Sequence, residues 1–288
     1  RINAAGRLEK ASDSVRLLIA DRKEHAEKLA AGINNLNAKR RELDNEITKE
    51  ALSMIERDTR LRDAKSTVLF NENWQKGVIG IVASRLTDSY YRPTIVLTRS
   101  NNLITGSARS IRSFDIYDAI DNCSDLLEHF GGHKYAAGLS LKPENLPEFM
   151  RRFEDYVSAN IENEELVPEL NVDLEINFSD ITPKFVRVLK QFAPFGPGNM
   201  SPVFLTKNVV DAGTSRSVGD KKHLKLTIFQ QNAPDNIFAG IAFQKGHIYN
   251  RVHSREPFDM CYCIEKNFWQ GKTNLQLNVK DIKFSEEY

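Results

Sequence analysis

The sequence is poor in the features that define several large protein classes. Its three cysteines are an odd number in a chain of 288 residues, which argues against a disulfide framework and fits a reducing compartment. No hydrophobic run approaches the length that spans a membrane, and no secretory signal opens the chain. We therefore expect a cytoplasmic protein with no membrane partner.

Motifs that hold a metal or activate a nucleophile are also missing. No P-loop or nucleophile-triad motif occurs. Cys261 and Cys263 have no second Cys or His pair at zinc spacing, so we interpret them as small buried apolar groups. His129 and His133 have i,i+4 spacing, but the paired glycines between them would break the helix that aligns them. The sequence therefore predicts no metal site and no catalytic residue.

The chain has no large excess of charge of one sign, because 40 Lys+Arg nearly balance 39 Asp+Glu and the net charge is only +1. The distribution along the chain is more informative. Residues 1–152 hold 25 Lys+Arg against 21 Asp+Glu, residues 153–183 hold none against 9, and residues 184–288 hold 15 against 9. Two mildly basic bodies thus flank an acidic connector, and the length suffices for two compact domains.

Two clusters of small and polar residues lie within one short segment, 106–138. Gly106-Ser-Ala-Arg-Ser110 supplies hydroxyl groups and a forked cation, and Gly131-Gly-His-Lys-Tyr-Ala-Ala-Gly138 supplies open backbone and a histidine. We interpret the two clusters together as an oxyanion or phosphate cradle. The simpler alternative is that the paired glycines only cap the helix expected over 117–130 and lead into a tight turn.

Periodic patterns predict the elements of the first half. A helical pattern over 11–20 precedes one long helix over 22–57, in which apolar residues recur at spacings of three, four or seven. An α/β domain follows. Its expected strands are 66–70, 94–98, 103–108 and 137–141, and its expected helices are 78–87, 117–130 and 144–156. Gly80 inside the first of these helices predicts a close contact between helix and sheet.

The second half is predicted to be all-β. Strict alternation over Leu170–Phe178 indicates a half-buried strand, and a short helix over 183–192 follows. Further strands are expected near 203–210, 224–229, 237–243, 258–264 and 275–279, which suits a small closed barrel. Phe268 and Trp269, beside Lys266 and Lys272, are candidates for a base-stacking platform, with burial in the core as the alternative.

Several of these motifs resemble one family. Gly77-Val-Ile-Gly-Ile-Val-Ala-Ser-Arg-Leu86 and the two clusters at 106–110 and 131–138 resemble the DHH-associated domain of the RecJ family of single-strand-specific exonucleases. Arg1-Ile-Asn-Ala-Ala-Gly-Arg7 resembles the last motif of the preceding DHH phosphoesterase domain. Pro194-Phe-Gly-Pro-Gly-Asn199 with His223-Leu-Lys-Leu226 resembles the RecJ oligonucleotide-binding (OB) fold.

The resemblance implies an order of domains. Residues 1–20 would end a DHH domain, 21–64 would form a connector helix, and 65–160 a DHH-associated substrate-binding domain. Residues 161–168 would be an acidic linker and 169–288 an OB fold that binds nucleic acid. The implied fold class is therefore an α/β domain with a long connector helix, followed by an all-β barrel.

The resemblance also implies an activity for the intact enzyme, which is 5′-to-3′ hydrolysis of single-stranded DNA in recombination and repair. Manganese or magnesium would be held by Asp and His clusters of the DHH domain. Residue 1 is Arg and those clusters are missing, so we expect a fragment that binds no metal and is inactive alone. Expected partners are single-stranded DNA, the DHH domain of the same parent chain, and a single-strand-binding protein or a helicase.

The residues expected to bind substrate come from both halves of the chain. On the motifs shared with the family they are Asn3, Arg7, Ser107, Arg109, Ser110, Gly131, Gly132 and His133, and on the barrel they are Phe268 and Trp269. Arg7, Ser107 and Arg109 match positions that hold the terminal phosphate. Two alternatives remain, namely a phosphodiesterase of the DHH superfamily that acts on oligonucleotides or nucleotides, and a non-catalytic single-strand-binding module.

Overall fold

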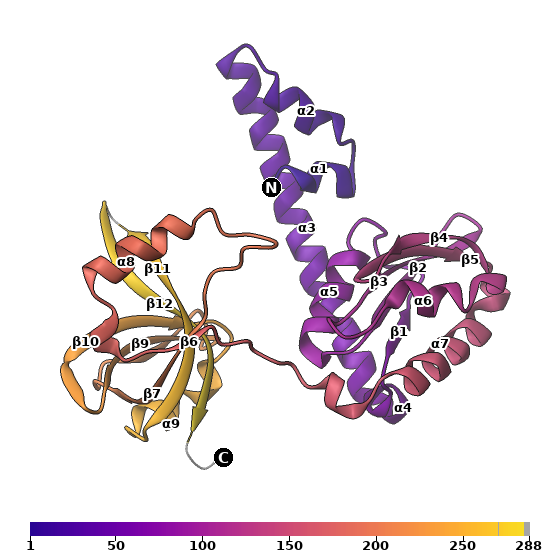
Figure 1. Cartoon of the computed structure of the whole chain (residues 1–288). Helices are drawn as coiled ribbons and strands as arrows, with labels where there is room; N and C mark the ends of the chain where they lie inside the picture. The colour runs from indigo at the N-terminus through magenta and orange to yellow at the C-terminus, as the bar shows by residue number, and fades with distance from the viewer. Residues whose placement is uncertain (270, 285–288) are drawn as a thin grey trace. The chain divides into compact units, whose positions relative to one another are not determined.

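The structure, a computed structural model, describes residues 1–269 and 271–284, apart from the side chains of Trp269 and Lys272. The chain divides into two compact units, Arg1–Pro168 and Glu169–Tyr288 (Figure 1). Each unit has its own hydrophobic core. In the described part of the chain, no helix combines the length and the apolar character that crossing a membrane requires.

A single long helix organises the start of the first unit. α3 (Lys23–Arg57) forms as expected, because its buried residues Ile33, Ile47, Ala51 and Ile55 follow helical spacing. The short helices α1 (Asn3–Leu8) and α2 (Ser12–Leu18) pack along its N-terminal part (Figure 1). α4 (Thr59–Asp63) follows α3 directly, and the Asp58 side chain caps its N-terminus.

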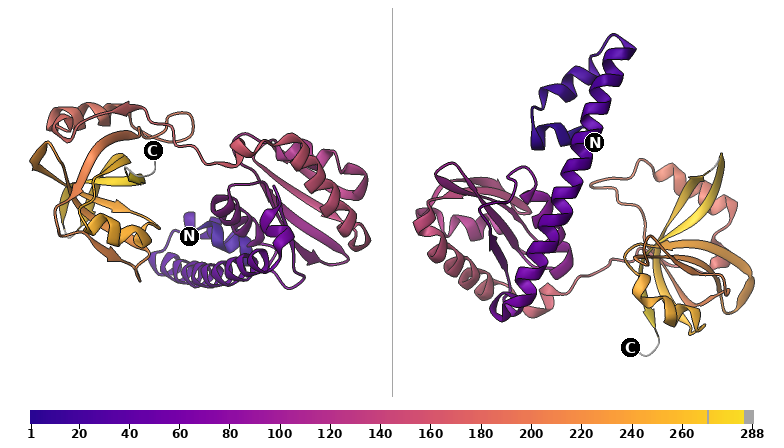
Figure 2. Two further views of the ribbon diagram at one scale, coloured as in Figure 1. Left: turned by 90° about the horizontal axis from the view of Figure 1, so that it is seen from below. Right: turned by 180° about the vertical axis from the view of Figure 1, so that it is seen from behind.

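A five-stranded sheet forms the body of this unit, in the order β1-β2-β3-β5-β4. β1 and β2 are parallel, and all other neighbours are antiparallel. The bounds are β1 (Thr67–Phe70), β2 (Thr94–Ser100), β3 (Leu103–Arg109), β4 (Leu127–His133) and β5 (Ala136–Leu141). α5 (Ile79–Tyr90) and α3 cover one face, while α6 (Ile116–Asp121) and α7 (Leu146–Asn160) cover the other (Figure 2).

The helix predicted over 117–130 is wrong. α6 ends at Asp121, a single 3-10 turn (Ser124–Leu126) follows, and β4 then carries Gly131 and Gly132 inside a strand rather than at a helix exit. Antiparallel pairing with β5 supplies the backbone hydrogen bonds of this segment, and Phe130 packs against the core. Tertiary pairing has thus overridden a locally helical composition.

The second unit is built on one curved, seven-stranded sheet. Its strand order is β6-β7-β11-β12-β10-β9-β8. The bounds are β6 (Leu174–Glu175), β7 (Phe204–Asp211), β8 (Arg216–Val218), β9 (His223–Gln230), β10 (Ala233–Ala242), β11 (Phe258–Trp269) and β12 (Lys272–Phe284). Helix α8 (Pro183–Leu189) continues into a 3-10 turn (Lys190–Phe192), and helix α9 (Tyr249–His253) precedes β11.

Two details of this unit correct the sequence predictions. Of the expected strand over 170–178, only Leu174–Glu175 forms a strand, paired with β7. The alternation does not mark one buried face either, because Leu170, Val172 and Leu174 are exposed and only Ile176 and Phe178 reach the core. The barrel is closed over only a short part of its length. The strands that would close it, β7 and β9, join over just three residue pairs, Val209–Asp211 with Ile228–Gln230. The sheet is therefore an incompletely closed barrel.

Candidate phosphate-binding site

The Arg109 side chain lies at the centre of the candidate site, at the end of β3. Its Nε donates to Ser84 Oγ on α5 (3.1 Å), and its Nη1 donates to Ser107 Oγ (3.0 Å) and to the Ala108 carbonyl (2.7 Å). Among the described residues, no carboxylate lies within ion-pair distance of Arg109, and Nη2 makes no hydrogen bond. The guanidinium is therefore oriented by hydroxyl groups but not neutralised.

The first turn of α5 shapes the space around Arg109. A Cβ at Gly80 would lie 2.9 Å from Ser107 Oγ and 3.1 Å from Arg109 Nη2, so glycine lets the helix approach β3 closely. This is the close helix–sheet contact that the sequence predicts for Gly80. No side chain caps the N-terminus of α5, whose partial positive charge favours an anion.

A second arginine approaches from α1. Arg7 is exposed and its Nη1 donates to the Gly77 carbonyl, just before α5 (3.3 Å). Gly77 leaves room for this contact, because a Cβ there would lie 1.8 Å from the Arg7 carbonyl oxygen. Burial and then the positive charge of Arg7 lower the pKa of Arg109 below its usual value. Two guanidinium groups thus converge where an anion would relieve their repulsion.

The sheet register brings the two predicted clusters together. His133 of β4 and Arg109 of β3 pair with the same residue of β5, which lies between them. Gly131 and Ser107 are related in the same way two residues further along the strands. Because adjacent strands are about 4.8 Å apart, His133 and Arg109 are separated by about 10 Å across the sheet. His133 is exposed, and its Nδ1 accepts from the Tyr135 backbone N–H (3.2 Å).

The glycines of β4 and β5 form an open floor on this face. A Cβ at Gly131 would meet no atom within 4 Å, and one at Gly138 would meet only the Gly106 carbonyl at 3.9 Å. Gly132 differs, because a Cβ there would lie 2.3 Å from the Ala136 carbonyl oxygen and disrupt the β4–β5 pairing. Beyond the floor, a shallow pocket of about 550 Å³ is lined partly by Lys76 and His129.

Two predicted residues lie at the margin of this group. The Ser110 hydroxyl donates to the Phe114 carbonyl (2.9 Å), so it stabilises the turn after β3. Asn3 is exposed at the start of α1, one helical turn before Arg7 and on the same side of the helix. The site thus contains Arg7, Ser107, Arg109, Gly131 and His133 on neighbouring elements.

The structure adds residues that the sequence analysis did not select as site residues. Ser84 contacts Arg109 directly, and Gly77 and Gly80 make room for the two arginines. All three lie within the Gly77–Leu86 motif. The spacing of Gly80 and Ser84, one turn apart on a helix next to β3, could have indicated that they share the face toward the sheet.

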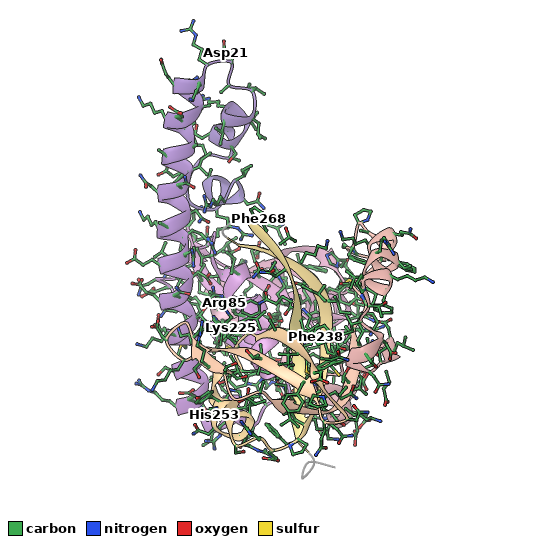
Figure 3. The ribbon with its side chains drawn as sticks, turned by 90° about the vertical axis from the view of Figure 1, so that its left-hand side faces the viewer. Asp21, Arg85, Lys225, Phe238, His253 and Phe268 are labelled. Carbon is green, nitrogen blue, oxygen red and sulfur yellow. The ribbon has the colours of Figure 1, made fainter. Side chains whose placement is uncertain are left out.

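The predicted stacking residues belong to the second unit. Phe268, at the end of β11, is 70% exposed, so its ring is not part of the core (Figure 3). It lies opposite Thr273 of β12. The Trp269 side chain lies outside the part of the chain that the structure describes, so its role stays a prediction.

The chemistry of the site fits an anion rather than a metal. Its donors are guanidinium, hydroxyl and backbone N–H groups, whereas Mn²⁺ and Mg²⁺ take carboxylate, carbonyl and water oxygens. Within residues 1–269 and 271–284, no group of three or more His, Cys, Asp and Glu side chains is placed to hold a metal ion.

Comparison with known proteins identifies both units. The model of the DHHA1 domain matches residues 63–159, and that of the RecJ OB domain matches residues 172–281. The single-stranded-DNA-specific exonuclease RecJ of Bacillus subtilis is 34% identical over 99% of this chain and 36% of its own length. The protein of the same name from Thermus thermophilus is 31% identical over 99% of this chain and 39% of its own length.

A solved structure agrees with these matches. The crystal structure of Thermus thermophilus RecJ in complex with Mn²⁺ aligns with 98% of this chain and 40% of its own, with a TM-score of 0.80 and 26% identity. A second structure of that protein holds Mg²⁺ and gives a TM-score of 0.79. The chain spans between about a third and a half of the length of the relatives named here.

The chain is thus a two-domain protein in which a DHHA1 domain is followed by an OB domain. The relatives that match almost the whole chain all carry the name RecJ, which narrows the assignment to one family. The chain belongs to the RecJ family, and it corresponds to the C-terminal portion of that family's proteins.

Proposed function

We propose that this chain is the substrate-binding portion of a RecJ-type exonuclease that degrades single-stranded DNA from its 5′ end. The observation that carries the proposal is the un-neutralised Arg109 guanidinium, which two serine hydroxyls orient beside Arg7. Such an arrangement fits a terminal phosphate, because a guanidinium fork binds phosphate oxygens in a bidentate geometry. The role of the intact protein would be in DNA recombination and repair.

The proposed binding mode assigns separate tasks to the residues of the site. Arg109 Nη2 and the Ser107 hydroxyl would hold two oxygens of the 5′ phosphate, and Arg7 would approach it from α1. The terminal nucleotide would then lie over the glycine floor of Gly131 and Gly138, where its sugar or base can approach the backbone. His133 would donate to a phosphate or sugar oxygen at the edge of this floor.

The function is tested by comparing affinities for two otherwise identical oligonucleotides. An oligothymidylate with a 5′ phosphate should bind this chain more tightly than one with a 5′ hydroxyl. The difference should shrink as salt is added, because phosphate neutralisation releases counterions. Equal affinity for the two ends at low salt would contradict the proposed 5′-phosphate site.

A second consequence of the proposal concerns catalysis by the chain alone. With Mn²⁺ added, these 288 residues should release no mononucleotides from single-stranded DNA, because the proposal assigns the metals to a DHH domain outside this sequence. The measurement is release of acid-soluble nucleotide by purified protein. Activity that a His133→Ala substitution abolishes would show that the catalytic groups lie here instead.

The OB unit should contribute through Phe268. Phe268→Ala should weaken binding of oligothymidylate by about 1–3 kcal/mol if a base stacks on the ring. The melting temperature should barely change, because the side chain is largely exposed. Phe258→Ala provides the contrast, since this ring is buried in the core and its removal should destabilise the unit. Unfolding caused by Phe268→Ala would assign that ring to the core as well.

A further inference from the structure

A buried carboxylate on the long helix α3 lies outside the phosphate site. Asp44 is fully buried, and its Oδ2 accepts from Arg40 Nη1 of the same helix (3.2 Å) and from Arg85 Nη2 of α5 (2.7 Å). Arg85 Nη1 also donates to the neighbouring Asn45 Oδ1 (3.0 Å). Arg40, Asp44 and Arg85 thus form a buried ionic group, the Asp44 cluster, in which the Arg85 fork spans two consecutive residues of α3.

Stability alone does not explain the Asp44 cluster. Apolar contacts already hold the two helices together, because Ile47 of α3 belongs to the same hydrophobic core as Val82 and Leu86 of α5. Within the residues that the structure describes, the buried Asp44 Oδ1 has no hydrogen-bond partner, which is unfavourable. Apolar side chains tolerate sliding, whereas a hydrogen-bonded ion pair has one favourable geometry, so the cluster specifies the position of α5 along α3.

The residue before Arg85 connects α5 to the phosphate site. Ser84 Oγ donates to the Gly80 carbonyl (3.1 Å) and accepts from Arg109 Nε (3.1 Å), so its hydroxyl has one defined orientation. Consecutive residues of a helix point about 100° apart, and Ser84 accordingly contacts β3 while Arg85 contacts α3. A displacement of α5 along α3 would therefore move Ser84 Oγ and, with it, the guanidinium of Arg109.

The same helix α3 also supports the second arginine of the site. α1 carries Arg7, and with its buried Ala4 and Ala5 it packs along the N-terminal part of α3 (Figure 1). α5 packs against the C-terminal part of α3. The separation between Arg7 and Arg109 thus depends on where α1 and α5 lie along one shared helix.

We propose that Asp44 and Arg85 are positioning residues of the 5′-phosphate site. Their ion pair fixes α5 on α3, and Ser84 then holds the Arg109 guanidinium at the distance from Arg7 that a terminal phosphate requires. Neither residue touches the phosphate, but together they determine how well the site distinguishes a phosphate from a hydroxyl group. This inference rests on the proposed 5′-phosphate site, and its test separates a failure of one from a failure of the other.

The test measures the preference for phosphorylated ends after the Arg85 fork is removed. Arg85→Met keeps an aliphatic side chain at a position where the side chain is 43% exposed, so the chain should fold. Dissociation constants of 5′-phosphorylated and 5′-hydroxyl oligothymidylate are measured with the full 288-residue chain at low salt. The ratio of the hydroxyl to the phosphate constant should fall by about three- to tenfold, as expected for a residue that acts through others. The affinity for the hydroxyl end should change by less than about twofold.

Arg152→Met is the matched control for loss of an arginine that joins two elements. Arg152 of α7 pairs with Asp125 at 2.8 Å, and α7 packs on the face of the sheet opposite to Arg109. The control substitution should leave the ratio within about twofold, even if it lowers the melting temperature, because distant sites contribute independently.

A double substitution shows whether Arg85 acts through Arg109. When Arg109→Ala has already removed the guanidinium, Arg85→Met should change the ratio by less than about twofold. The two substitutions are therefore expected to be strongly non-additive, which a general loosening of the fold would not produce.

Three outcomes would overturn the positioning role and leave the phosphate site in place. In the first, Arg109→Ala lowers the ratio but Arg85→Met does not. In the second, Arg85→Met and Arg152→Met lower it equally, and in the third, Arg85→Met is as effective in the Arg109→Ala chain as in the wild type. An unchanged ratio in Arg109→Ala itself would refute both the phosphate site and this inference. If Arg85→Met does not fold, Arg85→Lys replaces it with the same expectations, since an ammonium group lacks the fork that spans Asp44 and Asn45.

Discussion

Arg109→Lys should weaken the preference for a 5′-phosphorylated over a 5′-hydroxyl oligonucleotide while leaving the melting temperature nearly unchanged. Lysine keeps the positive charge, but its ammonium group cannot reproduce the planar fork that Ser84 and Ser107 orient. Arg109→Ala should go further and reduce the affinity for the phosphorylated end by about ten- to a hundredfold. This corresponds to the loss of a charge-assisted bond worth about 1.5–3 kcal/mol. The measurement is the ratio of the two dissociation constants for each variant.

The control for this prediction is Arg99→Ala on the neighbouring strand β2. Arg99 is exposed, pairs with Glu72 at 3.5 Å and lies five residues along β2 from Thr94, the partner of Arg109, so its removal takes away one positive charge of the same sheet without touching Arg109. Asp115 is not available to brace Arg109, because its side chain caps α6. If Arg109→Ala lowers the melting temperature and leaves the preference ratio intact, the guanidinium is structural and the phosphate site is refuted.

Arg92→Met should produce the largest loss of stability among the arginines of the first unit, about 3–5 kcal/mol. Arg92 is only 4% exposed, and its Nε donates to Thr67 Oγ1 (2.7 Å). Its two Nη atoms donate to the carbonyls of Leu61, Arg62 and Ala64, which α4 leaves without helical partners. Methionine would fill much of the volume but leave these carbonyls unsatisfied, which costs about 1–3 kcal/mol for each buried group.

The measurement for Arg92 is urea unfolding followed by the helical circular dichroism signal, which comes mainly from the first unit. Arg60→Met on α4 is the matched control. Its side chain is exposed and pairs with the exposed Asp58 at 3.6 Å, so the free energy of unfolding should change by less than about 0.5 kcal/mol. Equal effects of the two substitutions would mean that the carbonyls near Arg92 find other donors.

Much of the architecture could be predicted from the sequence because its periodicity is local. The apolar spacing of α3 and the positions of β1, β2 and β3 follow directly from the pattern of residues. The segment 117–130 could not be predicted in this way, since its strand exists only through pairing with β5. Similarly, the alternation over 170–178 gives no information on whether a neighbouring strand is present.

The candidate site was predicted in its residue types but not in its contacts. Motifs indicated Ser107 and Arg109, whereas the contribution of Ser84 depends on how closely α5 approaches β3. Arg85 is exposed at the surface of α5, and it also pairs with the fully buried Asp44 of α3 at 2.7 Å. Such a pair holds α5 against α3, and no periodic pattern reveals it because the partners are far apart in sequence.

The paired glycines of β4 would behave differently under selection, although they are neighbours in the chain. Side chains at position 132 would collide with the backbone of β5, so any requirement for a folded protein already maintains glycine there. Position 131 faces open space, and the fold would accept alanine or serine without a clash. A laboratory screen that rewards only folded, soluble protein should therefore accept substitutions at position 131 but retain glycine at position 132. A screen that rewards occupancy of the floor by a nucleotide should conserve both.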